Sequence, residues 1–157
     1  MDWDHHYWLQ RGSLELECNN ESLAENALSQ AAAIAPRDLL IQTEIAYLRL
    51  RQAVAEPNGV RSRELLRDGL ESLQTIMGDR KHFDPHQYDI YGRMVLRWVL
   101  RSDVTGAERE ESLREAAETV AQGRKVHPRD GRLRDWQVDI LNEQLGHSMA
   151  TPAPPQD

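Results

Sequence analysis

Signals that begin or end a helix recur along the whole chain, whereas signals for strands are almost absent. No segment alternates apolar and polar residues over several positions, as a half-buried strand would. Apolar residues instead recur at helical spacing between capping residues, loop residues and prolines. The pattern predicts an all-α protein with helices at residues 3–18, 22–35, 39–55, 62–77, 85–101, 106–127 and 131–146.

The limits of these helices follow from residues that favour helix ends. Ser22 and Thr105 each stand three residues before a glutamate, which is the pattern of a capping box. Aspartates that can accept hydrogen bonds from the first helical turn are predicted as three further N-caps: Asp38, Asp84 and Asp130. The Pro-Asn-Gly content of residues 56–60 predicts a loop there.

The size of the chain fits one domain, which we predict over residues 1–146. A chain of 157 residues can bury a core without disulfides or a structural metal. Its 39% hydrophobic and 29% charged residues favour a thin, well-solvated helical protein over an enzyme with a large interior. Residues 147–157 contain three prolines and no periodicity, so we expect a disordered tail.

The charge of the chain limits its partners. A net charge of −7 argues against nucleic acid and anionic membrane surfaces, because binding to phosphate usually needs a basic face. Cys18 is the only cysteine, which is consistent with a reducing compartment. No signal peptide opens the chain and no apolar run has the roughly 18 residues of a membrane span. The sequence therefore predicts a cytoplasmic protein that binds neither nucleic acid nor membrane.

Residues 8–36 resemble the signature of the tetratricopeptide repeat, in which aromatic, small, bulky and proline positions have a fixed spacing. The matching residues are Trp8, Gly12, Ala24, Leu28, Ala31 and Pro36. In this pattern Gly12 lets the second helix approach the first, and Leu28 fills the space between hairpins. Arg11 and Glu15 depart from it, because the family usually has leucine and an aromatic residue there.

Two later segments fit the resemblance more loosely. The second unit is matched by Ile45, Ala46, Gly69 and Leu73. The third is matched by Tyr88, Tyr91, Gly92, Val95, Ala116, Val120, Gly123 and Pro128. Over residues 5–145 the resemblance implies antiparallel helical hairpins stacked as a short right-handed solenoid, with the seventh helix as a solvating C-terminal cap. Because three units are near the minimum for a stable stack, a homodimer through an end face stays open.

The resemblance implies a protein-interaction module, either an adaptor or a chaperone-like protein, and not an enzyme. In this family the first helix of each hairpin lines a concave groove that binds a partner segment. The groove positions carried over to this chain are His6, Leu9, Ser13, Thr43, Tyr47, Leu50, His86, Asp89, Arg93 and Arg97.

A basic stripe lies among these positions, because Arg93, Arg97 and Arg101 repeat every four residues on one helix face. Arginine binds carboxylates bidentately, so we expect a protein or peptide partner with acidic and apolar residues. The same stripe would arise if the arginines only paired with nearby carboxylates on a solvated face. The sequence leaves both interpretations open.

No set of residues predicts catalysis, a cofactor or a metal. Asp2, Asp4, His5 and His6 offer metal-ligating atoms, but adjacent histidines on a helix point about 100° apart and seldom share a metal. Acidic residues at a helix start are also expected from the helix dipole. A metal-dependent enzyme using this cluster is therefore the less favoured alternative.

A second alternative comes from the segments "YWLQRGSLELE" and "LAENAL", which resemble helical-repeat regions attached to large bacterial P-loop or sirtuin-like NTPases. The chain contains no nucleotide-binding motif, so such an activity would belong to another polypeptide. This resemblance implies an accessory repeat subunit of a nucleotide-driven complex. The sequence leaves open the role of Trp3.

Overall fold

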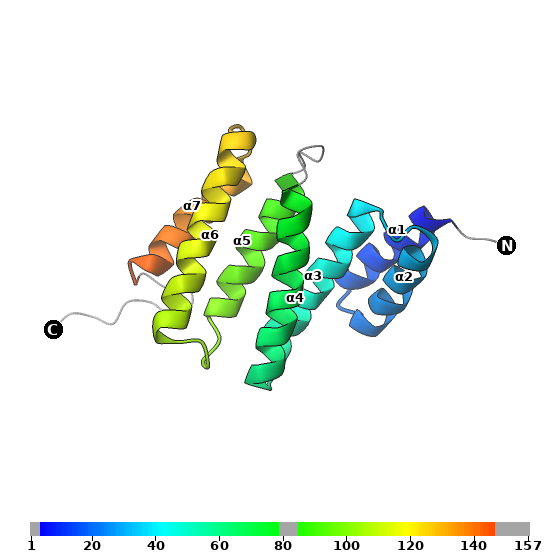
Figure 1. Cartoon of the computed structure of the whole chain (residues 1–157), viewed down its shortest axis with the longest axis horizontal. Helices are drawn as coiled ribbons and strands as arrows, with labels where there is room; N and C mark the ends of the chain where they lie inside the picture. Colours follow the sequence, from blue (N-terminus) through cyan, green and yellow to red (C-terminus); the bar gives the residue numbers. More distant parts are fainter. Residues whose placement is uncertain (1–3, 79–84, 147–157) are drawn as a thin grey trace. The chain divides into compact units, whose positions relative to one another are not determined.

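The computed structural model describes residues 4–78 and 85–146, and every regular element in these two ranges is a helix (Figure 1). The helices are α1 (His5–Glu17), α2 (Glu21–Ile34), α3 (Leu39–Ala55), α4 (Gly59–Met77), α5 (Pro85–Val99), α6 (Gly106–Val126) and α7 (Gly131–Gln144). The all-α prediction is therefore confirmed. The predicted tail at 147–157 and the predicted cap Asp84 lie outside the described residues.

The chain divides into two compact units, Met1–Asp79 and Arg80–Asp157. Unit 1 holds α1 to α4, and unit 2 holds α5 to α7. None of the helices in the described ranges is long and apolar enough to span a membrane.

Two of the predicted caps form as expected. The Asp38 carboxylate accepts hydrogen bonds from the backbone N–H groups of Leu40 (2.9 Å) and Ile41 (3.2 Å) at the start of α3. Asp130 does the same for the first turn of α7, at 2.9 and 3.3 Å. These contacts satisfy N–H groups that have no partner inside the helix, which is why the aspartates fix the two helix starts.

The structure corrects the prediction that Ser22 caps the second helix, because α2 already begins at Glu21 and Ser22 lies in its first turn. The chain turns within two residues, since Asn19 adopts a left-handed conformation with φ 61°. The Asn20 N–H then donates to the Glu15 carbonyl at 2.8 Å, which closes a Schellman-type turn at the end of α1. Thr105 precedes α6 as predicted, but its side chain makes no capping hydrogen bond.

The fourth helix also starts earlier than predicted. The side chain of Asn58 accepts a hydrogen bond from the Arg61 N–H at 3.0 Å, so α4 begins at Gly59, inside the predicted loop. Ser62, near the predicted start, is fully buried and donates to the Ala53 carbonyl at 2.6 Å. This bond ties the start of α4 to the end of α3.

In unit 1, α1 packs against α2, α3 packs against both α2 and α4, and α1 also contacts α3. Gly12 has the predicted role, because a Cβ atom there would lie 2.7 Å from Cγ of Leu28. Likewise, a Cβ atom at Gly69 of α4 would lie 2.8 Å from Cγ of Leu50 on α3. A buried cluster joins α1, α2 and α3 and consists of Leu16, Ala24, Leu28 and Leu48.

In unit 2, the helices α5, α6 and α7 all contact one another. A Cβ atom at Gly123 of α6 would lie 2.7 Å from the Tyr88 ring of α5, and one at Gly92 of α5 would lie 3.1 Å from Trp136 of α7. Helices α6 and α7 are also joined by an ion pair, in which Arg109 donates to the buried carboxylate of Glu143 at 2.6 Å.

The outward face of α7 differs from the polar surface expected of a solvating cap. Val138, Leu141 and Leu145 recur at helical spacing on this face and are each more than half exposed. Leu133 and Ile140, on the other side of the helix, are fully buried. The homodimer expected from the sequence stays a prediction.

Candidate protein-interaction surface

Three of the predicted groove residues are buried, which corrects the prediction that they are open to a partner. Leu50 is fully buried and contacts the Gly69 position of α4. Thr43 is also buried, and its hydroxyl donates to the Leu39 carbonyl at 2.7 Å. The carboxylate of Asp89 lies inside unit 2, among side chains of α5 and α7. The residue spacing placed these side chains on the correct helices, but the packing of those helices covers them.

The other predicted positions of unit 1 stay at least partly accessible. His6 is exposed, Ser13 is half-buried, and Leu9 and Tyr47 pack as half-buried side chains beside the cluster of Leu16, Ala24, Leu28 and Leu48. Leu9 of α1 and Tyr47 of α3 thus lie against the same buried cluster, and their role in a groove stays a prediction.

Arg51 was missed by the sequence reasoning and adds to this region. Its guanidinium lies 5.6 Å from the centre of the Tyr47 ring and donates to the Leu16 carbonyl (2.7 Å) and to Asn19 (2.6 Å). It therefore links α3 to the C-terminal end of α1, where a cation is favoured by the helix dipole. The four-residue spacing from Tyr47 was the available signal.

The described residues of the N-terminal Asp/His cluster make contacts at the starts of α1 and α3. The Asp4 carboxylate accepts from the Tyr7 N–H at 3.0 Å, and this hydrogen bond lowers the pKa of Asp4. Nε2 of His5 lies 3.7 Å from the Asp38 carboxylate, which caps α3. Asp2 lies outside the described residues, and within them no group of three or more His, Cys, Asp or Glu side chains is arranged to hold a metal ion.

In unit 2, the buried Asp89 gathers side chains from two helices. One carboxylate oxygen accepts from Arg93 at 2.5 Å, and the other accepts from the indole N–H of Trp136 at 2.6 Å. A guanidinium nitrogen of Arg132 lies 3.8 Å from the same carboxylate. Asp89 therefore holds Arg93 and Trp136 by hydrogen bonds at the contact of α5 and α7, with Arg132 within ion-pair distance.

The predicted arginine stripe has three different environments. Arg93 is held by Asp89, and Arg101 makes two 2.9 Å hydrogen bonds to Asp103. Arg97 is exposed, and no ion pair to it is found among the described residues. Arg93 and Arg101 are thus each paired with a nearby carboxylate, and only 12% of the Arg101 side chain is exposed. Arg97 points its charge to solvent one turn after Arg93. His86 lies half-buried in the first turn of α5.

We define the α5–α7 patch as Arg93, Arg132 and Trp136, which lie against the buried Asp89, together with the exposed Arg97, one turn after Arg93 on α5. Sequence reasoning missed the two α7 residues, because their approach to α5 depends on tertiary packing. Asp130 orients Arg132 at 3.3 Å. Burial alone would raise the pKa of Asp130, but hydrogen bonds from Arg132 and from the backbone N–H groups of Leu133 and Arg132 hold it below its usual value.

Asp139, further along α7, is expected to destabilise the folded protein at neutral pH. Burial raises the pKa of Asp139, and the nearby Asp135 and Glu143 carboxylates, each four residues away, raise it further. The cost of its charge is present above the folded-state pKa and disappears as the pH falls below the unfolded-state value. We expect Asp139→Asn to raise the free energy of unfolding by about 0.5 kcal/mol at pH 7. Urea titrations should show this gain shrinking towards acidic pH; a gain that grows there would contradict it.

No family model matches the chain, and neither the curated proteins nor the solved structures contain a significant match to it.

Proposed function

We propose that the chain is a tetratricopeptide-like helical-repeat protein, folded as a short right-handed solenoid, that acts as a protein-interaction adaptor. The observation that supports this proposal is a contact that recurs in consecutive helix pairs. In each pair, a large side chain of one helix packs against a glycine of the other. The three contacts are Gly12 with Leu28, Gly69 with Leu50, and Gly123 with Tyr88. The glycine is on the first helix of the first pair and on the second helix of the other two, so what recurs is the close approach of the two helices, which stacked helix pairs require.

The binding surface in this proposal includes the α5–α7 patch. Because Asp89 holds Arg93 in place, that side chain loses little further conformational freedom when a partner binds. Arg97 adds an exposed positive charge, and the half-buried Trp136 adds a flat apolar surface. The partner that fits is a segment with acidic and apolar residues. Binding would be passive, with apolar contacts supplying affinity and the arginines setting orientation and charge preference.

The experiment that tests this function is an affinity capture from the native host with the wild-type chain and with Arg97→Glu. Arg97 is the better position for charge reversal, because a glutamate at Arg93 would lie against the buried Asp89 and disturb folding. For a partner that contacts the patch, we expect Arg97→Glu to weaken binding at least about tenfold in a titration of the purified pair.

The matched control is Arg134→Glu, an exposed arginine of α7 that is not part of the patch. It makes the same charge change and should leave the affinity within about twofold. Circular dichroism of both variants checks that they stay folded. If a specific partner binds wild type and Arg97→Glu equally well, the patch is not the binding surface.

A further inference from the structure

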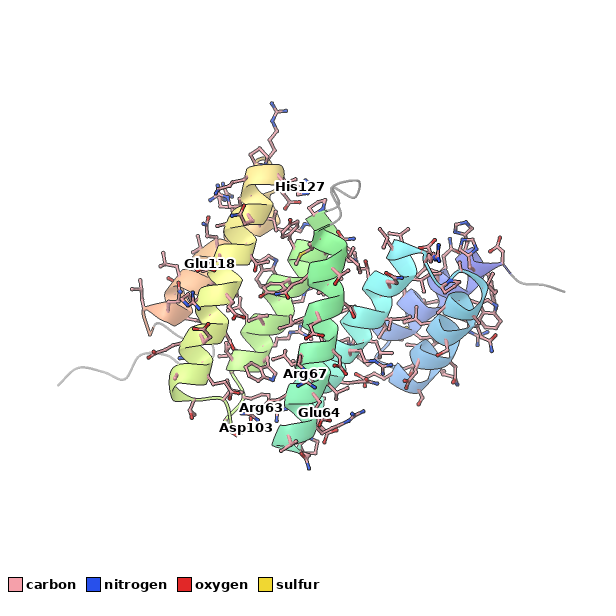
Figure 2. All side chains as sticks on the ribbon, in the orientation of Figure 1. Arg63, Glu64, Arg67, Asp103, Glu118 and His127 are labelled. Atoms are coloured by element: carbon pink, nitrogen blue, oxygen red, sulfur yellow. The ribbon has the colours of Figure 1, made fainter. Side chains whose placement is uncertain are left out.

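Helix α7 has two apolar faces, and the other helices of unit 2 cover one of them. Figure 2 shows α7, in orange, beside α6, and α7 also packs against α5. The covered face holds Leu133 and Ile140, both fully buried. On the opposite face Val138, Leu141 and Leu145 follow one another at spacings of three and four residues and are 51%, 52% and 64% exposed. We call these three residues the α7 apolar row.

The α7 apolar row differs from the other exposed apolar residues of the described ranges. In these ranges each of the other helices has at most two exposed large apolar side chains. The two on α2, Leu23 and Ile34, are eleven residues apart, which is about three helical turns. Single exposed apolar side chains are ordinary on a protein surface, whereas a contiguous row of them indicates a contact surface.

The row fits the same row of a second, antiparallel copy of α7. Arg134, Val138, Leu141 and Leu145 have the spacing of core positions in a two-helix coiled coil. In an antiparallel pair related by a two-fold axis, Val138 of each copy faces Leu141 of the other. Arg134 then lies beside Leu145 of the other copy, at the C-terminal end of that helix, where the helix dipole favours a cation. A parallel pair would instead bring the two Arg134 side chains into one layer, where their charges repel.

The residues that border the row also suit the antiparallel orientation. In this orientation Asp135 of one copy faces Asn142 of the other, and Gln137 faces Gln144. The Asn142 amide can donate to the Asp135 carboxylate. The Gln137 carbonyl oxygen already accepts from Arg124, which leaves its NH₂ group to donate to Gln144. The borders of the row therefore pair a carboxylate or an amide with an amide, and like charges do not meet there.

We propose that the α7 apolar row is the contact face of a homodimer, in which two copies of α7 pack antiparallel about a two-fold axis. A second copy is the occupant because the face complements itself in both its apolar residues and its charges, as a two-fold contact requires. The contact is about three helical turns long, so it is small for a protein interface and we expect a dissociation constant on the order of 100 µM. The face includes neither Arg97 nor Trp136, so this inference does not rest on the proposed adaptor function.

Sedimentation velocity of the full chain, from about 10 µM to about 500 µM, tests the dimer. A reducing agent keeps the exposed Cys18 from forming a disulfide between chains. We expect the average mass of wild type to rise with concentration from that of one chain towards that of two. Leu141→Glu should weaken dimerisation at least about tenfold, because it places a carboxylate in the apolar contact. The matched control is Leu14→Glu on α1, where the leucine is 58% exposed, and it should leave dimerisation within about twofold of wild type.

An equimolar mixture of Val138→Lys and Leu141→Glu tests the orientation. In an antiparallel dimer of one chain of each kind, the introduced lysine faces the introduced glutamate, so the mixture should associate at least about tenfold more tightly than either variant alone. In a parallel dimer the two charges lie in different layers and no such recovery occurs.

Three results would overturn the proposal. They are a wild-type chain that stays monomeric at every concentration, equal dimerisation of Leu141→Glu and Leu14→Glu, and a mixture that associates no better than its separate components. Circular dichroism checks that each variant stays folded. None of these measurements involves Arg97, so they leave the adaptor function to its own test.

Discussion

Replacing Gly69 by valine should lower the free energy of unfolding by about 3 kcal/mol. A Cβ atom at this position would lie 2.8 Å from the Leu50 side chain and 3.2 Å from the Ala46 carbonyl oxygen. Leu50 is fully buried and the carbonyl belongs to the backbone of α3, so neither can move away cheaply. The two helices would have to separate, which exposes apolar surface along their whole contact.

Urea titration followed by circular dichroism measures this loss, and Gly131→Val is the matched control. Gly131 opens α7, and a Cβ atom there would have no neighbour within 4 Å. The control should change the free energy of unfolding by less than about 0.5 kcal/mol. Equal stability of the two variants would show that α3 and α4 do not pack through Gly69.

Asp89→Ala is expected to lower the free energy of unfolding by about 3 kcal/mol. The substitution removes the buried carboxylate and leaves the Arg93 guanidinium and the Trp136 indole N–H without their acceptor. Arg93 and the Trp136 indole both donate to this carboxylate, and only 6% of the Asp89 side chain is exposed. The loss of these bonds would also release Arg93 and Trp136 from their fixed positions in the α5–α7 patch.

The same urea titration measures this effect, with Asp135→Ala as control. The Asp135 side chain is 72% exposed, and its contact with Arg134 is long, at 3.8 Å. Its removal should change the free energy of unfolding by less than about 0.5 kcal/mol. A loss of that small size for Asp89→Ala would mean that the carboxylate does not join α5 to α7.

The helices could be predicted from the sequence because their ends depend on local chemistry. Asp38 and Asp130 act within three residues of the N–H groups that they bind, so a short stretch of sequence contains the whole interaction. Ser22 failed as a predicted cap for a related reason. The left-handed conformation of Asn19 turns the chain so that α2 begins at Glu21, one residue before Ser22. Asn19 and Asn20 are polar residues like Ser22, so the sequence did not show which of the three directly precedes the helix.

The close helix contacts could also be predicted, since a glycine within an apolar face marks a place where a neighbour approaches. Gly12 was expected to admit the second helix, and it lies against Leu28. For the accessible surface the same spacing was insufficient. Residues at the same helical spacing can face solvent or a neighbouring helix. Leu50 of α3 is covered because α4 packs over it at Gly69.

The α5–α7 patch combines residues separated by more than forty positions in the chain, namely Asp89 and Trp136. The sequence alone could not show that the Trp136 indole N–H donates to a buried carboxylate. The patch could therefore be recognised only from the tertiary structure.

Hydrogen–deuterium exchange, measured with and without a purified partner obtained by affinity capture, tests the adaptor function most directly. The account predicts slower exchange in α5 and in the first half of α7 when the partner is bound, and loss of this protection in Arg97→Glu. Protection restricted to α6, or protection that is unchanged by Arg97→Glu, would contradict binding at the α5–α7 patch.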